Sequence, residues 1–324
     1  MLPINTHLPS ASQLVYGCMG LGGGWNDTAV GVQDVMQTQE IVELCLELGI
    51  TVFDHADIYT FGKAEQAFGQ VLSQQPSLRE HMILQSKCAI RFADDLGPKR
   101  YDFSGQYLTE SVDGILQRLS VAQLDILILH RPDPLMDIRE VASTIELLQQ
   151  QGKIKHVGVS NMSVGQIALL QSALNTPLVC NQIEMSLGHH PMIESNITAN
   201  NAGIQGQNDF SGLLEYAQLY NIQLQAWGSL AQGRFSKSLS ALAEGSVATD
   251  ARIAKLVHSL ADKYATSATA IVLAFLLRLP QGIQPVIGTT QPQRIKECVS
   301  AQSFTLSHAD WFALLVAVRG EELP

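Results

Sequence analysis

Four side chains with complementary acid–base chemistry lie at the ends of apolar runs in this sequence. Asp54 follows one run, and Tyr59 comes five residues later within the segment FDHADIY. Lys87 and His130 each directly follow a further run. In parallel α/β barrels, catalytic groups lie at the carboxyl ends of strands, so these residues are candidates for one site.

These residue types can together transfer a proton. A tyrosine has an unperturbed pKa of about 10, and a nearby ammonium favours the phenolate and lowers that value. We therefore expect Lys87 to bring the Tyr59 proton into a useful range, and Asp54 to hold Lys87 charged and in place. His130 can orient a carbonyl oxygen and share its developing charge. The set predicts a proton donor beside an oxyanion site.

Each residue alone has a plainer interpretation. Asp54 can be a helix N-cap or an ion-pair partner, Tyr59 a half-buried packing residue, Lys87 a solvated charge and His130 a core histidine. Against this stands the number of polar groups that end strands, because such groups cost desolvation energy unless they are paired. The further strand ends are Ser160-Asn161, Asn181-Gln182, Trp227 and Gly288-Thr289-Thr290.

Short apolar runs alternate with amphipathic segments along the chain, and this pattern predicts strands and helices in turn. Strands are expected at Leu14–Met19, Ile50–Phe53, Met82–Ser86, Leu124–Leu129, Ile154–Val159, Leu178–Cys180, Ile222–Ala226 and Gln284–Ile287. Helices are expected at Gln37–Leu48, Lys63–Leu72, Ser104–Leu119, Ile138–Gln150, Val164–Leu174, Leu213–Leu219, Ala251–Ala265, Ala268–Leu279 and Pro292–Cys298.

Eight strands that alternate with helices imply parallel pairing and right-handed crossovers. Apolar residues throughout the strands fit a sheet that is covered on both faces. We therefore predict an α/β fold, a (β/α)₈ TIM barrel, in one domain spanning residues 1–324. The alternative of two Rossmann halves is disfavoured, since Gly20 and Gly22 are followed by Trp25 where that fingerprint needs glycine.

Two segments exceed a minimal barrel. Residues 189–209 form a long polar stretch after strand six, which we expect to be a functional or mobile loop. Residues 307–319 predict an extra C-terminal helix, with Ser307 as N-cap and Asp310 three residues later.

The composition excludes several classes of protein. The net charge is −10 and the first Lys or Arg is Lys63, which argues against binding to nucleic acid or to anionic membranes and against a secretory signal peptide. No apolar run is long enough to span a bilayer. The five cysteines are widely spaced without a Cys-x-x-Cys pair, so we expect buried reduced thiols in a cytoplasmic protein.

The ordered motifs resemble the aldo-keto reductases. FDHADIYTFGKAE, SKCA, LILHRPDP, GVSN, NQIE and VIGTTQPQR occur in the order and spacing of that family, over nearly the whole length. The sequence looks like a bacterial member of the group that carries HRPDP after strand four. The resemblance implies a catalytic tetrad of Asp54, Tyr59, Lys87 and His130, with Tyr59 as general acid for carbonyl reduction and hydride from the nicotinamide.

The resemblance also implies positions that contact NADPH. Ser160, Asn161 and Gln182 would bind the carboxamide, and Trp227 would stack on the ring where many members have Tyr. The remaining cofactor positions are Met19, Gly20, Asp54, Ser229, Leu230, Gln232, Gly233, Gly288, Thr289, Thr290 and Arg294. Arg294 suits a 2′-phosphate because a guanidinium binds bidentately. Gly288 stands where many relatives have Lys, so the preference for NADPH depends mainly on Arg294 and on the hydroxyls of Thr289 and Thr290.

The substrate is expected to be a small carbonyl compound, and Trp25, Phe61 and Arg131 are candidates to line its site together with Tyr59 and His130. No metal is predicted, since the adjacent His189 and His190 share no helix face and no carboxylate or cysteine pattern accompanies them. The oligomeric state stays open between monomer and dimer.

Two other functions use the same residues. One is an NADPH-binding regulatory or sensor protein with little turnover. The other is a Schiff-base lyase that uses Lys87, which would need a depressed lysine pKa and no close carboxylate.

Overall fold

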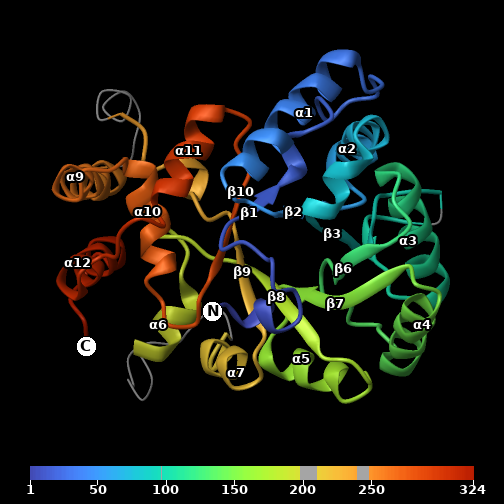
Figure 1. Ribbon diagram of the computed structural model, residues 1–324. Coiled ribbons are helices and arrows are strands. Elements are labelled where there is room, and N and C mark those ends of the chain that lie inside the picture. Colours follow the sequence, from blue (N-terminus) through green and yellow to red (C-terminus); the bar gives the residue numbers. More distant parts are fainter. Residues whose placement is uncertain (96, 198–209, 239–247) are drawn as a thin grey trace. The chain divides into compact units, whose positions relative to one another are not determined.

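The computed structural model describes residues 1–95, 97–197, 210–238 and 248–324 (Figure 1). Eight parallel strands form a closed barrel in the order β1-β10-β9-β8-β7-β6-β3-β2. This order confirms the predicted (β/α)₈ barrel and rules out the alternative of two Rossmann halves. The chain divides into two compact units, Ile4–Gln182 and Met1–Pro3 with Ile183–Pro324, called here the N-terminal and C-terminal units.

The N-terminal unit contains the strands that carry most of the predicted catalytic residues. They are β1 (Val15–Gly17), β2 (Val52–Asp54), β3 (Ile83–Cys88), β6 (Leu124–Leu129), β7 (Ile154–Ser160) and the larger part of β8 (Leu178–Glu184). The helices are α1 (Val32–Glu47), α2 (Lys63–Gln74), α3 (Gly105–Leu119), α4 (Ile138–Gln150) and α5 (Val164–Gln171).

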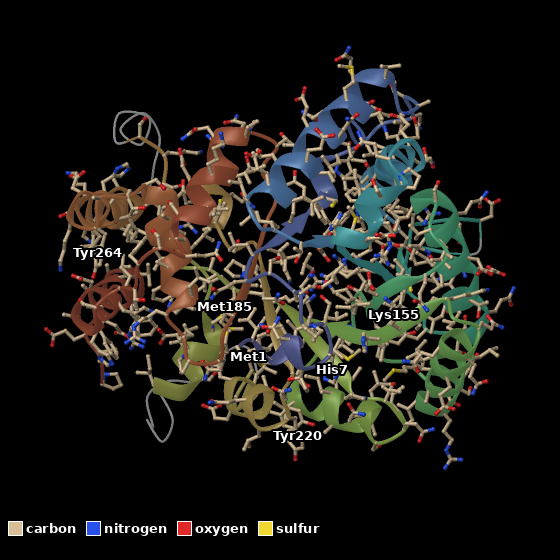
Figure 2. All side chains as sticks on the ribbon, in the orientation of Figure 1. Met1, His7, Lys155, Met185, Tyr220 and Tyr264 are labelled. Atoms are coloured by element: carbon tan, nitrogen blue, oxygen red, sulfur yellow. The ribbon has the colours of Figure 1, made fainter. Side chains whose placement is uncertain are left out.

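Local signals explain where these helices begin. Asp137 caps α4 by accepting from the backbone N–H groups of Arg139 and Glu140, and Ser104 caps α3 in the same way. At the other end of the strands, the carboxylate of Asp125 accepts from Arg79 at 2.8 Å and from Lys155 at 2.7 Å; Lys155 is labelled in Figure 2.

The C-terminal unit contains β9 (Gln223–Trp227) and β10 (Gln284–Ile287) with six helices in its described part. These are α6 (Pro191–Ile197), α7 (Leu213–Leu219), α9 (Ala248–Lys263), α10 (Ala268–Leu277), α11 (Pro292–Ser300) and α12 (His308–Arg319). The predicted extra helix is α12, and the Ser307 hydroxyl accepts from Asp310 N as expected for its cap. Tyr264, labelled in Figure 2, donates to Asp310 at 2.6 Å and so anchors this helix.

Three expectations were wrong in detail. The stretch 189–209 was expected to be a loop, but it includes helix α6, and its residues 198–209 lie outside the described part of the chain. Strand β8 continues to Glu184, because its residues up to Ile183 are buried, so Asn181 and Gln182 lie within the strand. The antiparallel pair β4 (Ile90–Arg91) and β5 (Arg100–Tyr101) was missed, since two-residue strands leave no periodic signal.

All five cysteines are buried and free of disulfides, as predicted. Among the described residues no single helix has the length and apolar composition to cross a membrane, although the bent pair Thr249–Lys263 and Ala268–Leu277 meets the test jointly.

Candidate active site

The centre of the candidate site is a buried ion pair between Asp54 and Lys87. Asp54 ends β2, and the Lys87 ammonium on the neighbouring strand donates to both of its carboxylate oxygens at 2.6 Å. The two side chains are only 2% and 1% exposed. Two amides complete the arrangement, since Gln85 donates to Asp54 Oδ1 at 2.6 Å and Gln182 at 3.1 Å. Because a buried charge needs such partners, the carboxylate fixes where the ammonium lies.

Tyr59 lies on a strained turn that follows β2. The turn spans Tyr59–Gly62, and its residues Thr60 and Phe61 have φ values of 47° and 60°. A β-branched or bulky residue at positive φ costs about 1–3 kcal/mol and occurs mainly where function requires it. The Thr60 hydroxyl donates to Leu21 O at 3.2 Å, which ties the turn to the segment after β1. The strained turn gives Tyr59 its fixed position.

Lys87 lies beside Tyr59, with its ammonium 5.0 Å from the centre of the phenol ring. Burial raises the pKa of Tyr59 and outweighs the opposing effect of Lys87. The expectation that Lys87 brings this pKa below its usual range is therefore wrong for the protein without ligands, because desolvation is the larger effect. Tyr59 is instead a fully protonated acid at neutral pH.

The lysine itself stays charged. Burial lowers the pKa of Lys87, but Asp54 and Tyr59 raise it by more, so the net shift is upward. A protonated lysine is not a nucleophile, so the structure gives no support to the Schiff-base lyase hypothesis.

His130 directly follows β6 and lies next to Tyr59. The two ring centres are 6.3 Å apart and the rings are nearly perpendicular, at 83°. Burial lowers the pKa of His130 to about 2, and Lys87 adds to this effect, so the imidazole is neutral. Its Nδ1 is buried and has no hydrogen-bond partner within the described chain. A neutral imidazole keeps one N–H that can donate to a substrate oxygen.

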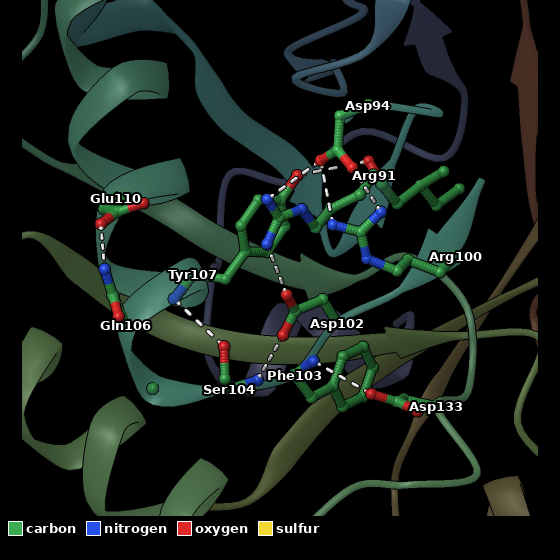
Figure 3. Close-up of polar contacts among 12 residues, drawn as sticks. Arg91, Asp94, Arg100, Asp102, Phe103, Ser104, Gln106, Tyr107, Glu110 and Asp133 are labelled. Carbon is green, nitrogen blue, oxygen red and sulfur yellow. Dashed lines mark hydrogen bonds and ion pairs between the residues drawn. The ribbon is translucent and has the colours of Figure 1, made fainter. Parts of the chain in front are cut away.

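Asp133 of the HRPDP segment contacts the chain between β5 and α3 (Figure 3). Asp133 accepts from the backbone N–H of Phe103 at 3.1 Å. Nearby, Arg91 donates to Asp102 at 2.9 Å. The aspartate of this segment is therefore a structural residue that joins the loop after β6 to the start of α3.

Ser160, Asn161 and Gln182 are brought together at the ends of β7 and β8. The Ser160 hydroxyl donates to Gln182 O at 2.8 Å, and the Asn161 amide donates to Ser160 Oγ at 2.7 Å. Asn161 has a φ of 58°, a conformation that asparagine tolerates better than most residues. The three predicted carboxamide contacts thus form one connected polar group with Asp54.

Three aromatic side chains line the edge of the site. Trp25 meets Phe61 edge-on with ring centres 5.3 Å apart, and Phe61 lies 5.4 Å from Phe92. Each is between 40% and 50% exposed. Lys63 holds the segment that follows Trp25 by donating to the backbone oxygens of Asn26 and Thr28 at 2.9 Å. The three rings form a half-exposed aromatic row that includes Phe61 of the turn carrying Tyr59.

The predicted cofactor residues of the C-terminal unit follow its two strands. Trp227 ends β9, and the Ser229 hydroxyl donates to Val286 O at 2.8 Å. A tight turn follows, with positive φ at Gln232 and Gly233. The segment after β10 leads into α11, where the Arg294 guanidinium is exposed and makes no hydrogen bond within the described residues.

The remaining predicted residues occupy less informative places. Met19 and Gly20 are exposed in a short turn after β1, and Arg131 follows His130. His190 contacts Glu194 at 3.4 Å. Within the described residues no group of three or more His, Cys, Asp and Glu is arranged to hold a metal ion.

The sequence interpretation missed two residues of the site. Gln85 binds Asp54 directly, and its place two residues before Lys87 on the same strand puts both side chains on one face, a signal that was available. Phe92 extends the aromatic row, but it lies in the unpredicted loop between β4 and β5.

Comparison with known proteins identifies the family of the chain. The model of the family described as "Aldo/keto reductase family" matches residues 13–315. The chain therefore belongs to the aldo/keto reductase family.

Two of its curated relatives carry the names of oxidoreductases. Oxidoreductase YdhF of Escherichia coli is 33% identical over 98% of this chain and 96% of its own length. The 6-dehydroglucose reductase of Agrobacterium fabrum is 33% identical over 96% of each chain. Among solved structures, the glycerol dehydrogenase from Gluconobacter oxydans superposes with a TM-score of 0.77 at 21% identity, covering 96% of this chain and 92% of its own, which shows the shared fold. Nicotinamide-dependent carbonyl reduction is the general activity of this family.

Proposed function

We propose that this protein reduces an aldehyde or ketone to an alcohol with NADPH, and that Tyr59 donates the proton. The observation that carries the proposal is the buried Asp54–Lys87 pair with its ammonium 5.0 Å from the Tyr59 ring. An apolar pair of similar volume would serve the fold as well, since buried ion pairs rarely add net stability. The ion pair therefore points to a role in the chemistry.

Each member of the tetrad has one task in the proposal. His130 donates its N–H to the carbonyl oxygen of the substrate and fixes that oxygen beside Tyr59. Tyr59 then transfers its phenolic proton to the same oxygen as negative charge develops there. Lys87 stabilises the phenolate that is left behind, and Asp54 keeps Lys87 charged. In oxidation the same phenolate takes the proton back.

The residues present fit a nicotinamide cofactor. The exposed Arg294 guanidinium in the first turn of α11, which makes no hydrogen bond to the described residues, suits the 2′-phosphate of NADPH. We propose that Ser160, Asn161 and Gln182 bind the carboxamide and that Trp227 stacks on the ring. When bound, NADPH supplies the hydride.

We propose the other cofactor contacts on the family resemblance. They are Met19, Gly20, Asp54, Ser229, Leu230, Gln232, Gly233, Gly288, Thr289 and Thr290. The substrate would contact Trp25, Phe61 and Arg131 besides Tyr59 and His130, and the chain would act as a single cytoplasmic domain without a metal.

The test is the Tyr59→Phe variant. We expect turnover to fall by roughly 10²–10⁴, the usual scale for general acid catalysis. Binding of NADPH, followed by fluorescence titration, should hardly change. Turnover should be measured with a panel of aldehydes and ketones. The panel should include a 6-dehydro sugar, because the relative from Agrobacterium is named for reducing one. Wild-type turnover in the variant would show that the tetrad is assigned wrongly.

The sensor hypothesis is separated by the same titration. Tight NADPH binding without consumption of any carbonyl in the wild-type protein would favour it over a reductase.

A further inference from the structure

A second polar recess lies in the N-terminal unit, beside the turn that carries Tyr59. It is a groove of about 360 Å³, a size that small-molecule sites commonly have. Phe61 and Phe92 form apolar walls. Asp57, Tyr107, Ser111 and Arg118 supply polar groups, and we call this the Arg118 groove.

Arg118 is held in place with part of its guanidinium available. Its Nε donates to the buried carboxylate of Glu65 at 2.7 Å, which is its one side-chain hydrogen bond within the described residues. Two glycines make room for the side chain, because a Cβ on Gly62 would lie 3.0 Å from Cδ and a Cβ on Gly114 would lie 2.9 Å from Nη1. The two terminal nitrogens are left with donor capacity.

Asp57 brings a carboxyl group of which one oxygen lacks a partner. This Oδ1 is buried and accepts no hydrogen bond from the described residues, while the backbone N–H of Asp57 donates to Lys87 O at 2.9 Å. Burial and, to a smaller extent, the nearby Glu65 raise the pKa of Asp57 to about 7, against the opposing effects of Arg118, a backbone hydrogen bond from Ile58, and Lys87. The titratable groups that face Asp57 are Glu65 on α2, Lys87 and Cys88 on β3, and Tyr107 and Arg118 on α3. Near neutral pH the carboxyl group therefore carries a proton for much of the time.

These groups present donors rather than acceptors to a ligand. Arg118 offers N–H groups, Ser111 offers a hydroxyl, and a protonated Asp57 offers an O–H. The Tyr107 hydroxyl already donates to Ile90 O at 3.4 Å. Glu110, which accepts from Gln106 at 2.8 Å (Figure 3), adds one negative charge to the lining and disfavours a ligand with two. Aromatic walls favour a flat apolar body.

We propose that the Arg118 groove binds a small aromatic monocarboxylate, whose carboxylate accepts from Arg118 and from the Asp57 carboxyl group while its ring packs against Phe61 and Phe92. The carboxylate position in this groove is distinct from the proposed carbonyl position at Tyr59, and the two sites share Phe61 as a wall. Asp57 and Phe61 flank Tyr59 in sequence.

The test uses phenylacetate as the probe in isothermal titration calorimetry of the full chain. If only the protonated Asp57 binds, a pKa near 7 makes the dissociation constant about tenfold larger at pH 8 than at pH 6. Asp57→Asn should bind with little pH dependence, because the amide still donates. Glu110→Gln should bind more tightly at both pH values.

Further variants locate the probe. Arg118→Gln should weaken binding at least tenfold. Phe92→Ala, which disturbs no buried ion pair, should weaken it severalfold and serves if the arginine variant fails to fold by circular dichroism. Tyr59→Phe should leave binding unchanged.

Three results would overturn the proposal. One is that Tyr59→Phe loses phenylacetate binding while Phe92→Ala keeps it in full, which would place the carboxylate against Tyr59. Another is tighter binding of phenethylamine than of phenylacetate. The third is no heat of binding at a probe concentration of about 10 mM, because a useful site binds at roughly millimolar or tighter.

Discussion

Removal of the Asp54 charge tests the central ion pair most directly. In Asp54→Asn, Lys87 remains 1% exposed and loses the carboxylate that holds it at 2.6 Å. Removing one partner of a buried pair costs about 3–5 kcal/mol, because the other charge stays desolvated. For a chain of this size such a loss lowers the melting temperature by roughly 6 °C or more.

The destabilisation by Asp54→Asn should depend on pH. In the wild-type protein the pKa of Lys87 is raised, so the pair stabilises the fold below the unfolded-state pKa and loses that effect only as pH rises through the higher folded value. In Asp54→Asn the effect of the carboxylate is lost, so burial lowers the lysine pKa and is opposed by Tyr59. The difference in unfolding free energy between wild type and variant should therefore be large at pH 7 and shrink towards pH 10.

The assay is denaturant unfolding at pH 7, 8.5 and 10, with the double variant Asp54→Asn/Lys87→Met as the matched control. The double variant should recover most of the lost stability, since a neutral pair of similar volume carries no desolvated charge. An Asp54→Asn protein as stable as wild type, or equally destabilised at every pH, would refute the argument that Asp54 holds a charged Lys87.

Three further results are expected. Arg294→Ala should weaken NADPH by about 10–100-fold, the value of a charged hydrogen bond, and NADH much less; equal losses in titrations of both would exclude the 2′-phosphate contact. Asp57→Asn should raise the unfolding free energy at pH 8 by on the order of 2–4 kcal/mol. The reason is that the folded pKa of Asp57 is about 7, so its ionisation costs stability as pH rises above the unfolded-state pKa. The result is contradicted if urea unfolding shows no larger stabilisation of the variant at pH 8 than at pH 5. The pH profile of kcat/KM from pH 5.5 to 8 should contain no limb from His130, whose pKa is lowered to about 2; a limb that Asp57→Asn keeps and His130→Gln loses would count against a neutral imidazole.

The fold was largely predictable, because burial on both faces makes each barrel strand a short apolar run. Strand β6 and helix α4 have the bounds expected from their patterns. The errors concern the ends of elements, which the apolar pattern does not determine. Helix α1 begins at Val32, five positions before the predicted Gln37, although Val32, Val35 and Met36 already have helical spacing; only Val35 of these is buried.

The catalytic residues were predictable for a related reason. Strands alternate their faces and end at one side of the barrel, so a polar residue at the end of an apolar run is conspicuous in the sequence. The pKa of Tyr59 was not predictable in this way. Its direction depends on whether burial or Lys87 has the larger effect, and only the packing around the ring decides that.

The Arg118 groove shows the limit of sequence interpretation most clearly. Glu65, Gly62 and Gly114 each look ordinary on their own helices. Their shared role follows from the packing of α2 against α3. Gly62 and Gly114 leave room for the Arg118 side chain, which donates to the Glu65 carboxylate. Asp57 looks like a turn residue in FDHADIY, yet packing leaves its Oδ1 without a partner among the described residues, two positions from the proposed proton donor. Asp57 and Phe61 line the groove, and Tyr59 lies between them in the chain, so the groove and the tetrad share one short segment.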